Sequence, residues 1–342
     1  MKILVTGGLG FIGSHVVVEL LNTDYQVIIL DNLSNSSINV LERIQVISNK
    51  KPVFEKLDLR DQQSVSDFFT RNHDIDGVIH FAASKAVGES VQNPLLYYEN
   101  NVNSLVYLLK ELQKLPKSNL IFSSSCTVYG QADELPITEI SPVKPAESPY
   151  GNTKQIGEEI IADVCKVDPS LNAIALRYFN PIGAHDSGLI GELPLGTPQN
   201  LIPYITQTAI GLREQLSIFG DDYPTKDGTA VRDYIHVVDL AKAHVVALER
   251  LINQSAAINF ETFNIGTGTG SSVLEVVHAF ENASGISLNY KIVQRRDGDV
   301  TAAYADTTKA NNVLGWKAQL TLKDALKSAW KWQQNVVDIK ES

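Results

Sequence analysis

The chain has 342 residues, of which 44% are apolar and 20% charged, and its formal net charge is −10. This length allows one large or two modest domains with a substantial core, and the composition is that of a folded globular protein. The excess of acidic residues argues against a nucleic acid or a membrane surface as partner, and we expect neither.

Hydrophobic periodicity in the first half predicts strands that alternate with helices. The strand-like segments are short apolar runs, namely 2–6, 26–30, 53–57, 77–80, 119–122 and 173–177. The first helical stretch, 11–21, has apolar residues at helical spacing. This alternation predicts an α/β fold with a doubly wound parallel sheet of the Rossmann type, covered by helices on both faces.

The pattern changes after Phe179. Segment 180–198 is rich in glycine and proline and predicts a long loop, a kind of segment that is often functional in compact proteins. Helical patterns follow at 201–212, 239–251, 273–283 and 322–336. We expect a first domain over 1–179, completed by about 235–265, and a smaller α/β substrate-binding part made of 180–234 and 266–342.

Cysteine and histidine usage bears on compartment and metal binding. The chain has two cysteines, Cys126 and Cys165, and seven scattered histidines. We see no cationic leader and no apolar segment near the roughly 20 residues of a membrane span. These features predict a cytoplasmic protein without a metal site.

The segment after the first strand is rich in glycine, with Gly7, Gly10 and Gly13 at the start of a helix. Glycines let the backbone approach a pyrophosphate, whose charge is stabilised by free N–H groups at the helix N-terminus. Asp31 ends the second strand, 18 residues after Gly13, where an acidic side chain binds ribose hydroxyls and repels a 2′-phosphate. The pattern therefore predicts NAD as cofactor rather than NADP.

Two further strand ends fit a dinucleotide. Asp58 follows the third strand and is suited to accept from the adenine amino group, although an ordinary loop aspartate is an alternative. Phe81, Ala82 and Ala83 end the fourth strand, with alanines small enough for a dinucleotide to lie across the sheet edge. In such folds, ligands bind at the carboxyl ends of the strands.

Hydroxyl groups follow the fifth strand at Ser125 and Thr127, and Tyr150 and Lys154 begin the next helix. Four-residue spacing places the tyrosine and the lysine on one helical face. For proton transfer near neutrality the pKa of Tyr150 must fall from about 10, a shift worth roughly 4 kcal/mol. One cation about 4 to 6 Å away supplies about 3 to 4 kcal/mol at an effective dielectric near 20, so Lys154 and an oxidised nicotinamide would suffice.

Several motifs resemble a known family, the extended short-chain dehydrogenase/reductases. They are TGGLGFIG (6–13), SSSCTVYG (123–130), SPYGNTK (148–154) and RYFNPIGAH (177–185). The more specific motifs FGDDYPTKDGTAVRDYIHVVDLAKAH (219–244) and RRDGDV (295–300) resemble the UDP-glucose 4-epimerases. The resemblance extends over essentially the whole chain.

This resemblance implies C4 epimerisation of a UDP-hexose with retained NAD, through a 4-keto sugar. Tyr150 would remove the O4 proton, Ser125 would hydrogen-bond O4, and Lys154 would hold the nicotinamide ribose and lower the pKa of Tyr150. The further cofactor contacts it implies are Phe11, Ile12, Asp31, Asn32, Asp58, Leu59, Phe81, Lys85, Asn100 and Phe179. On the substrate side it implies Asn180, Asn200, Leu201, Phe219, Arg232, Tyr234, Arg296 and Asp299. A homodimer is also expected from the resemblance.

Arg232 and Arg296 are the local cations that an acidic protein needs to bind a diphosphate, although surface ion pairing with the adjacent aspartates is an alternative. Ala303 departs from the family pattern, in which glucose-restricted members carry a bulky aromatic residue near the sugar. The free space predicts that UDP-N-acetylhexosamines are also accepted, unless Tyr304 fills it.

Two other functions are considered. A sugar-nucleotide 4,6-dehydratase should carry an acidic pair after the reactive threonine, whereas Thr127 is followed by Val128 and Tyr129. A regulator that binds nucleotides without chemistry should not need the serine, tyrosine and lysine of the reacting centre. Epimerisation is therefore favoured over both.

Overall fold

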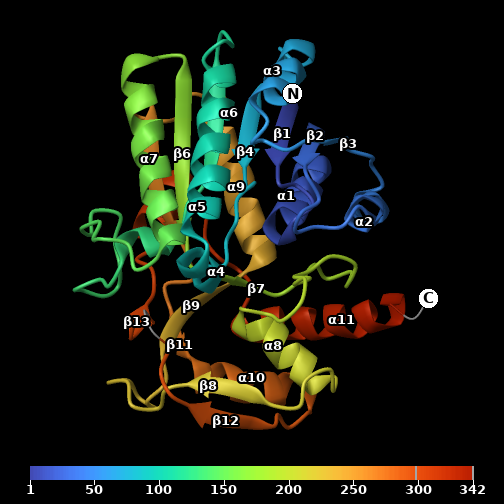
Figure 1. Cartoon of the computed structure of the whole chain (residues 1–342), viewed down its shortest axis with the longest axis vertical. Coiled ribbons are helices and arrows are strands. Elements are labelled where there is room, and N and C mark those ends of the chain that lie inside the picture. The colour runs from blue at the N-terminus through green and yellow to red at the C-terminus, as the bar shows by residue number, and fades with distance from the viewer. Residues whose placement is uncertain (297–298, 341–342) are drawn as a thin grey trace.

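The computed structural model describes residues 1–296 and 299–340. Figure 1 shows a larger α/β part at the top and a smaller part below it. Within the described residues, the main sheet has seven strands in the order β10-β6-β5-β4-β1-β2-β3, and all neighbouring pairs are parallel. The strands are β1 (Lys2–Thr6), β2 (Gln26–Asp31), β3 (Val53–Lys56), β4 (Gly77–His80), β5 (Ser118–Ser123), β6 (Leu171–Tyr178) and β10 (Phe260–Ile265).

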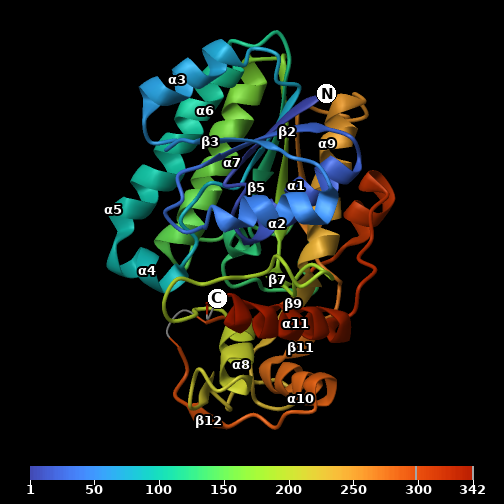
Figure 2. The same ribbon diagram turned by 90° about the vertical axis from the view of Figure 1, so that its right-hand side faces the viewer.

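Helices cover both faces of this sheet, which confirms the predicted fold class. Alternate residues of β1 point to opposite faces, so Ile3 and Val5 join one apolar cluster and Leu4 the other. The first face is covered by α1 (Phe11–Asn22), α2 (Asn39–Ser48) and α9 (Val237–Ile252). The second is covered by α3 (Gln62–Arg71), α6 (Ser104–Leu112) and α7 (Pro149–Val167). Figure 2 shows α3 and α6 on one side and α9 on the other.

The smaller part is organised around β9 (Val231–His236), which pairs with β7 (Asn180–Ile182), β11 (Gly270–Ser272) and β13 (Ala302–Ala303). A second pair of strands consists of β8 (Leu216–Phe219) and β12 (Tyr290–Val293). The helices that pack here are α8 (Leu201–Ala209), α10 (Val273–Ser284) and α11 (Leu322–Lys340). A capping box of Ser272 and Glu275 begins α10, and Gly285 in the left-handed conformation ends it.

Short helical segments connect these parts. They are α4 (Val87–Gln92), α5 (Pro94–Tyr97), the π-helix η1 (Tyr98–Asn103), the 3₁₀-helix η2 (Cys126–Tyr129) and the π-helix η3 (Ala310–Leu314). The segment η2 follows β5 at the carboxyl edge of the main sheet, and both η1 and η2 pack against α7. This edge is where the predicted chemistry should lie.

The six predicted strands of the first half are confirmed within two residues at each end. Two predictions need correction. Segment 180–198 is not all loop, because its first three residues form β7, which is too short to show a pattern of its own. The helix predicted over 201–212 ends at Ala209, since the chain turns through Ile210 and then Gly211 with φ +82°.

The structure brings segments from the second half of the chain into the larger part. Strand β10 pairs with β6 in the main sheet, and helix α9 packs against α1 on one of its faces. The domain boundaries given above remain a prediction. Within residues 1–296 and 299–340, no helix is long and apolar enough to cross a membrane, and no group of three or more potential ligand side chains is arranged to hold a metal ion.

Candidate active site

The turn from β1 into α1 brings the backbone closer together than a side chain would allow. Gly7 has φ +67°, and a Cβ added to Gly13 would lie 2.3 Å from the Gly7 carbonyl oxygen. Gly10 precedes α1 without a side-chain cap, and the first turn of this helix has no acidic residue. Its backbone N–H groups are therefore donors at the positive end of the helix dipole. This turn fits the phosphates of a dinucleotide.

Asp31 lies at the end of β2 beside this turn. Its carboxylate accepts hydrogen bonds from the Leu9 N–H at 3.1 Å and from the Leu33 N–H at 2.9 Å. The Ser36 hydroxyl donates a third at 2.8 Å. Because Leu9 belongs to the glycine-rich turn, the predicted ribose-binding carboxylate and the predicted phosphate-binding backbone are adjacent.

At the next strand ends, the Asn32 amide donates to the Asp58 carboxylate at 3.1 Å, and Arg60 pairs with the same carboxylate at 2.7 Å. The Arg60 guanidinium and the Asn32 amide hold the pKa of Asp58 at about 2. Asp58 is therefore a charged acceptor at neutral pH. The side chain of Leu59, by contrast, is buried in the core.

Residues that follow β4 close the other side of the glycine-rich turn. A Cβ on Gly7 would lie 2.8 Å from the Ala82 backbone nitrogen, and the Ala82 N–H donates to Thr6 Oγ1 at 3.4 Å. Phe81 and Ala83 on either side are half-buried. The small side chains predicted here thus lie against the turn.

Lys85 and Asn100 extend the same edge. The Lys85 ammonium lies 5.9 Å from the ring centroid of Phe11, the first residue of α1, and Ile12 next to it packs on the core. Asn100, in η1, donates through Nδ2 to the Ser84 hydroxyl at 3.0 Å. Single π-helical turns are frequent at functional sites.

The predicted reacting groups lie at the ends of β5 and α7. Ser125 precedes η2, and its Oγ accepts from the Thr127 N–H at 3.2 Å. Tyr150 and Lys154 share a face of α7, with the Lys154 ammonium 5.8 Å from the Tyr150 ring centroid. This ammonium donates to the Ser123 carbonyl oxygen at 2.6 Å. The structure therefore brings serine, tyrosine and lysine to one sheet edge.

Burial shifts the pKa values of both Tyr150 and Lys154. Burial and the nearby Tyr178 raise the pKa of Tyr150, and the Ser125 hydroxyl acts in the opposite direction. Burial lowers the pKa of Lys154 to about 8, while Glu158 raises it. The protein groups alone thus do not give Tyr150 a low pKa. A further positive charge is needed beside the phenol, and an oxidised nicotinamide carries one.

Four residues predicted for the substrate lie at paired positions around β9. Asn180 on β7 is opposite Tyr234, and Ala303 on β13 is opposite Arg232. The Tyr234 ring belongs to the apolar cluster beneath α8 and α10. The register of three short strands, distant in sequence, therefore brings these residues together.

The predicted basic residues both have partners. Arg232 Nη2 donates to Asp299 Oδ1 at 2.5 Å, and this pair is largely buried. The Arg296 guanidinium lies 4.4 Å from the ring centroid of Phe219. Two guanidinium groups and an aromatic face are the kinds of group that bind a diphosphate and a planar base.

Glu192 joins the two sides of the site, and sequence reasoning missed it. Its Oε1 accepts from the Lys85 ammonium at 3.1 Å and from the Asn200 amide at 2.6 Å. Asn200 precedes α8, which begins at Leu201, and does not cap it. No motif marks Glu192, because its partner Lys85 is distant in sequence and Asn200, eight residues away, follows no regular spacing.

A small apolar cluster near Ser125 contains Phe179 and Ala303, with Cys126 packed against it. Tyr304 does not belong to this cluster. A Cβ on Gly270 would lie 3.1 Å from Tyr304 Cδ1, so its ring faces β11. Neighbouring strand residues point to opposite faces, which agrees with this orientation. Tyr304 therefore points away from the side of β13 on which Ala303 packs.

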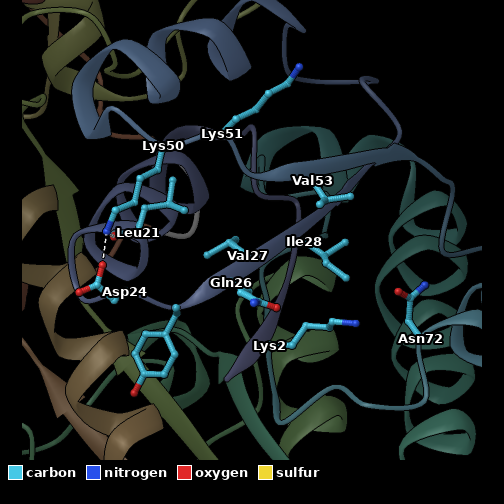
Figure 3. Close-up of a pocket in the computed structure, with 11 residues that line it drawn as sticks. Lys2, Leu21, Asp24, Gln26, Val27, Ile28, Lys50, Lys51, Val53 and Asn72 are labelled. Carbon is cyan, nitrogen blue, oxygen red and sulfur yellow. Dashed lines mark hydrogen bonds and ion pairs between the residues drawn. The ribbon is translucent and has the colours of Figure 1, made fainter.

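A separate hollow of about 460 Å³ lies at the opposite ends of β1 and β2, and Figure 3 shows the residues that line it. The Lys2 ammonium pairs outside it with Asp74 at 2.6 Å, and Lys50 pairs with Asp24 within it. Because doubly wound folds bind ligands at the carboxyl ends of their strands, this hollow is distinct from the candidate site.

Comparisons with known proteins agree with this geometry. A family model described as GDP-mannose 4,6 dehydratase matches residues 4–329. UDP-glucose 4-epimerase of Bacillus subtilis (strain 168) is 51% identical over 338 residues, which cover 99% of this chain and 98% of the relative. The Mus musculus UDP-glucose 4-epimerase is 50% identical over 339 residues, 97% of this chain and 96% of the relative.

Solved structures give the same result. UDP-glucose-4-epimerase from Stenotrophomonas maltophila, with bound NAD and formylated UDP-arabinopyranose, has TM-score 0.95 and 47% identity and covers 99% of both chains. The Bifidobacterium longum UDP-glucose 4-epimerase, in complex with NAD⁺ and UDP, has TM-score 0.93 and 49% identity and covers 98% of both. The chain therefore belongs to the extended short-chain dehydrogenase/reductases and, within them, to the UDP-glucose 4-epimerase family.

Proposed function

We propose that this protein interconverts UDP-glucose and UDP-galactose by inverting C4 of the sugar, with NAD as a retained cofactor. One observation carries the proposal. The glycine-rich turn and the group of Ser125, Tyr150 and Lys154 lie at the same edge of the main sheet, and β9, the strand that carries Arg232, lies beyond that edge (Figure 1). The reaction needs a dinucleotide site, a phenol that transfers a proton and a cation that binds the diphosphate.

The glycine-rich turn and Asp31 would hold NAD, because the turn leaves room and donors for phosphates and the carboxylate accepts ribose hydroxyls. When bound, NAD supplies a reversible hydride acceptor for C4, so the net reaction is redox neutral. Lys85, Phe11 and Asn100 would contact the cofactor beyond the phosphates. These assignments are supported by their positions around the turn.

Tyr150 would take the proton from O4 of the sugar and return it after the sugar has turned. Lys154 would hold positive charge next to the phenol and favour its ionised form. Ser125 would hydrogen-bond O4 and keep the hydroxyl oriented toward Tyr150. Phe179 would lie beside the nicotinamide, which its place in the small apolar cluster against which Cys126 packs supports.

The UDP group would bind on the β9 side. Arg232 and Arg296 would contact the diphosphate, and Phe219 would lie against the uracil, with Asp299 holding Arg232 in place. Asn200 would contribute an amide donor at the start of α8. Asn180, Leu201 and Tyr234 would complete this side of the site.

A 4,6-dehydratase is the alternative that the name of the matching family model raises. Elimination of water needs carboxylates next to the reactive threonine, but Val128 and Tyr129 follow Thr127 and are fully buried. The Tyr129 hydroxyl donates to Asn264 Oδ1 at 2.6 Å. Neither residue supplies an acid or a base, so epimerisation is favoured.

The function is tested by incubating the purified protein with UDP-galactose and no added cofactor, followed by chromatography of both C4 epimers. We expect UDP-glucose to form, because NAD remains bound during purification. The absence of any epimer, even after NAD is added, would refute the proposal. A 4-keto-6-deoxy product would favour the dehydratase instead.

We further propose that UDP-N-acetylhexosamines are substrates. Ala303 presents a methyl group in the cluster beside Ser125, and Tyr304 faces β11. A methyl group in place of a bulky side chain would leave room for the N-acetyl group. We expect UDP-N-acetylgalactosamine to be epimerised at a rate similar to that of UDP-galactose, and no turnover of it beside good turnover of UDP-galactose would contradict this.

We also propose a homodimer in the cytoplasm. Val87, Val91 and Leu95 on α4 and α5 are 48%, 62% and 78% exposed, which supports an apolar surface that a second copy covers. Cys126 and Cys165 are both free, as expected in a reducing compartment. Sedimentation of the wild-type protein and of Leu95→Glu tests the homodimer. The wild type should sediment as a dimer, and the charge introduced at position 95 should shift the variant to monomer.

A further inference from the structure

Glu158 is a buried carboxylate one helical turn after Lys154 on α7, and it is only 7% exposed. Its Oε1 accepts from the Ser124 hydroxyl and from Arg177 Nε, the latter at 2.9 Å. Its Oε2 accepts from Arg177 Nη2 at 2.5 Å. This bidentate pair with a third donor fixes the carboxylate in one orientation.

The same helix face holds the end of β5 at two successive residues. Lys154 donates to the Ser123 carbonyl oxygen at 2.6 Å, and Glu158 accepts from the hydroxyl of Ser124. The next residue is Ser125. The position of its hydroxyl relative to α7 therefore depends on the bonds that Lys154 and Glu158 make.

Arg177 connects the carboxylate to the segment beyond Ser125. Its Nη1 donates to the Tyr129 hydroxyl at 3.0 Å, and that hydroxyl donates to Asn264 Oδ1 at 2.6 Å. Tyr129 ends η2, the helix that Ser125 precedes. The short segment that carries Ser125 is thus held at both ends by one buried network.

Among the residues described, Glu158 is also the carboxylate that raises the pKa of Lys154. Burial keeps His80 on β4 neutral, with a pKa of about 3. Burial also raises the pKa of four phenols and one thiol in this region, and all five groups are therefore uncharged near neutrality. They are Tyr150 on α7, Tyr178 on β6, Tyr97 on α5, Tyr129 and Cys126. Arg177 is cationic and faces Glu158.

From this geometry we infer that Glu158 is a positioning residue of the epimerisation, which holds the end of β5 and Ser125 against α7 and places a negative charge one helical turn from the Lys154 ammonium. The inference rests on the proposed function, because Ser125 and Lys154 take their roles from it. Arg177 fixes the carboxylate and links it to Tyr129.

The test compares Glu158→Gln with Glu159→Gln, which removes the same charge from the next, exposed residue of α7. In Glu158→Gln, the negative charge near Lys154 is removed, while the positive charge of Arg177 remains. The ammonium form of Lys154 therefore becomes less favourable. We expect the alkaline limb of the kcat/KM profile for UDP-galactose to move about one pH unit or more toward acid, a loss of about tenfold on that limb. Glu159→Gln should keep the wild-type profile.

A second variant guards against misfolding, because an unpaired buried Arg177 destabilises the fold. The double variant Glu158→Gln/Arg177→Met removes both charges, and thermal unfolding shows which proteins are folded. The negative charge next to Lys154 is also absent there, so the limb should again move toward acid. An alkaline limb at the wild-type position in every folded variant would overturn the inference. A wild-type protein without epimerase activity would instead overturn the proposed function.

Discussion

The cofactor side and the substrate side of the candidate site are built differently. On the cofactor side, the glycine-rich turn and Asp31 follow consecutive strands of one parallel sheet, so its topology alone brings them to one edge. On the substrate side, β7, β9 and β13 come from distant parts of the chain and meet through short pairings. The first arrangement follows from the order of strands, whereas the second depends on register.

The two sides also differ in the kind of contact that shapes them. Gly7 and Gly13 are required because backbone atoms lie where a side chain would be. Arg232 and Arg296 instead act through charged groups at the ends of long side chains. We therefore expect the cofactor side to tolerate almost no change and the substrate side to lose affinity gradually. Substitutions on the two sides should therefore differ in the size of their effects.

The largest effect is expected for Tyr150→Phe, which removes only the phenol oxygen at the point where both sides meet. General acid–base groups contribute about 10²- to 10⁴-fold, so kcat should fall by at least about 10²-fold while bound NAD remains. Tyr98→Phe makes the same change at a hydroxyl that accepts from the Asn152 amide at 2.8 Å. A Tyr150→Phe enzyme with wild-type kcat would contradict the assignment of the base.

Gly13→Ala should have the next largest effect. The added Cβ would lie 2.3 Å from the Gly7 carbonyl oxygen, so the turn has to open. We expect loss of NAD from the purified protein and about 1–3 kcal/mol of destabilisation, measured by absorbance and by denaturant unfolding. Gly88→Ala is the matched control, because its Cβ would meet no atom within 4 Å. Equal NAD content in both variants would be evidence against the phosphate site.

Arg232→Met keeps the aliphatic stem but removes the charge on the substrate side. Hydrogen bonds to charged groups contribute about 1.5–3 kcal/mol, so KM for UDP-galactose should rise at least about tenfold, with a smaller change in kcat. Arg213→Met serves as control, since Arg213 lies over the Tyr204 ring, with its guanidinium carbon 4.8 Å from the centroid. An unchanged KM would remove Arg232 from the diphosphate site.

Ala303→Tyr fills the space proposed for the N-acetyl group. We expect turnover of UDP-N-acetylgalactosamine to fall at least about tenfold, because overpacking costs about 1–3 kcal/mol, while turnover of UDP-galactose changes little. The ratio of the two kcat/KM values is the measurement. Equal losses for both substrates would mean that the variant disturbs the whole site and not the sugar subsite.

Asp58→Asn should have the smallest effect. The pKa of this carboxyl is about 2 in the folded protein, below its usual 3.8, so the charged form stabilises the fold above pH 3.8 and this contribution disappears as the pH falls toward 2. The ion pair with Arg60 is about one-third exposed, so we expect less than about 1 kcal/mol in urea unfolding at pH 7. The wild type and the variant should have more similar stabilities near pH 2, and a difference that grows there would contradict the assignment.

Much of the fold could be predicted from the sequence because its signals are local. The alternation of apolar strands and helices gave the doubly wound sheet, and the spacing of Tyr150 and Lys154 gave their shared helix face. Glu192 and Glu158 could not be found in this way, because each acts through partners that only tertiary packing brings near. The burial of Tyr150, which raises the pKa of its phenol, likewise follows from packing that no local pattern records.

The central claim is that both sides of the site act on one sugar carbon in a closed, redox-neutral cycle. The most direct measurement uses UDP-galactose that carries deuterium at C4, with the UDP-glucose product examined by mass spectrometry and NMR. We expect the deuterium to remain at C4 of the product, because the hydrogen that leaves the carbon returns to it within the same site. Product that carries solvent hydrogen at C4 would contradict the account.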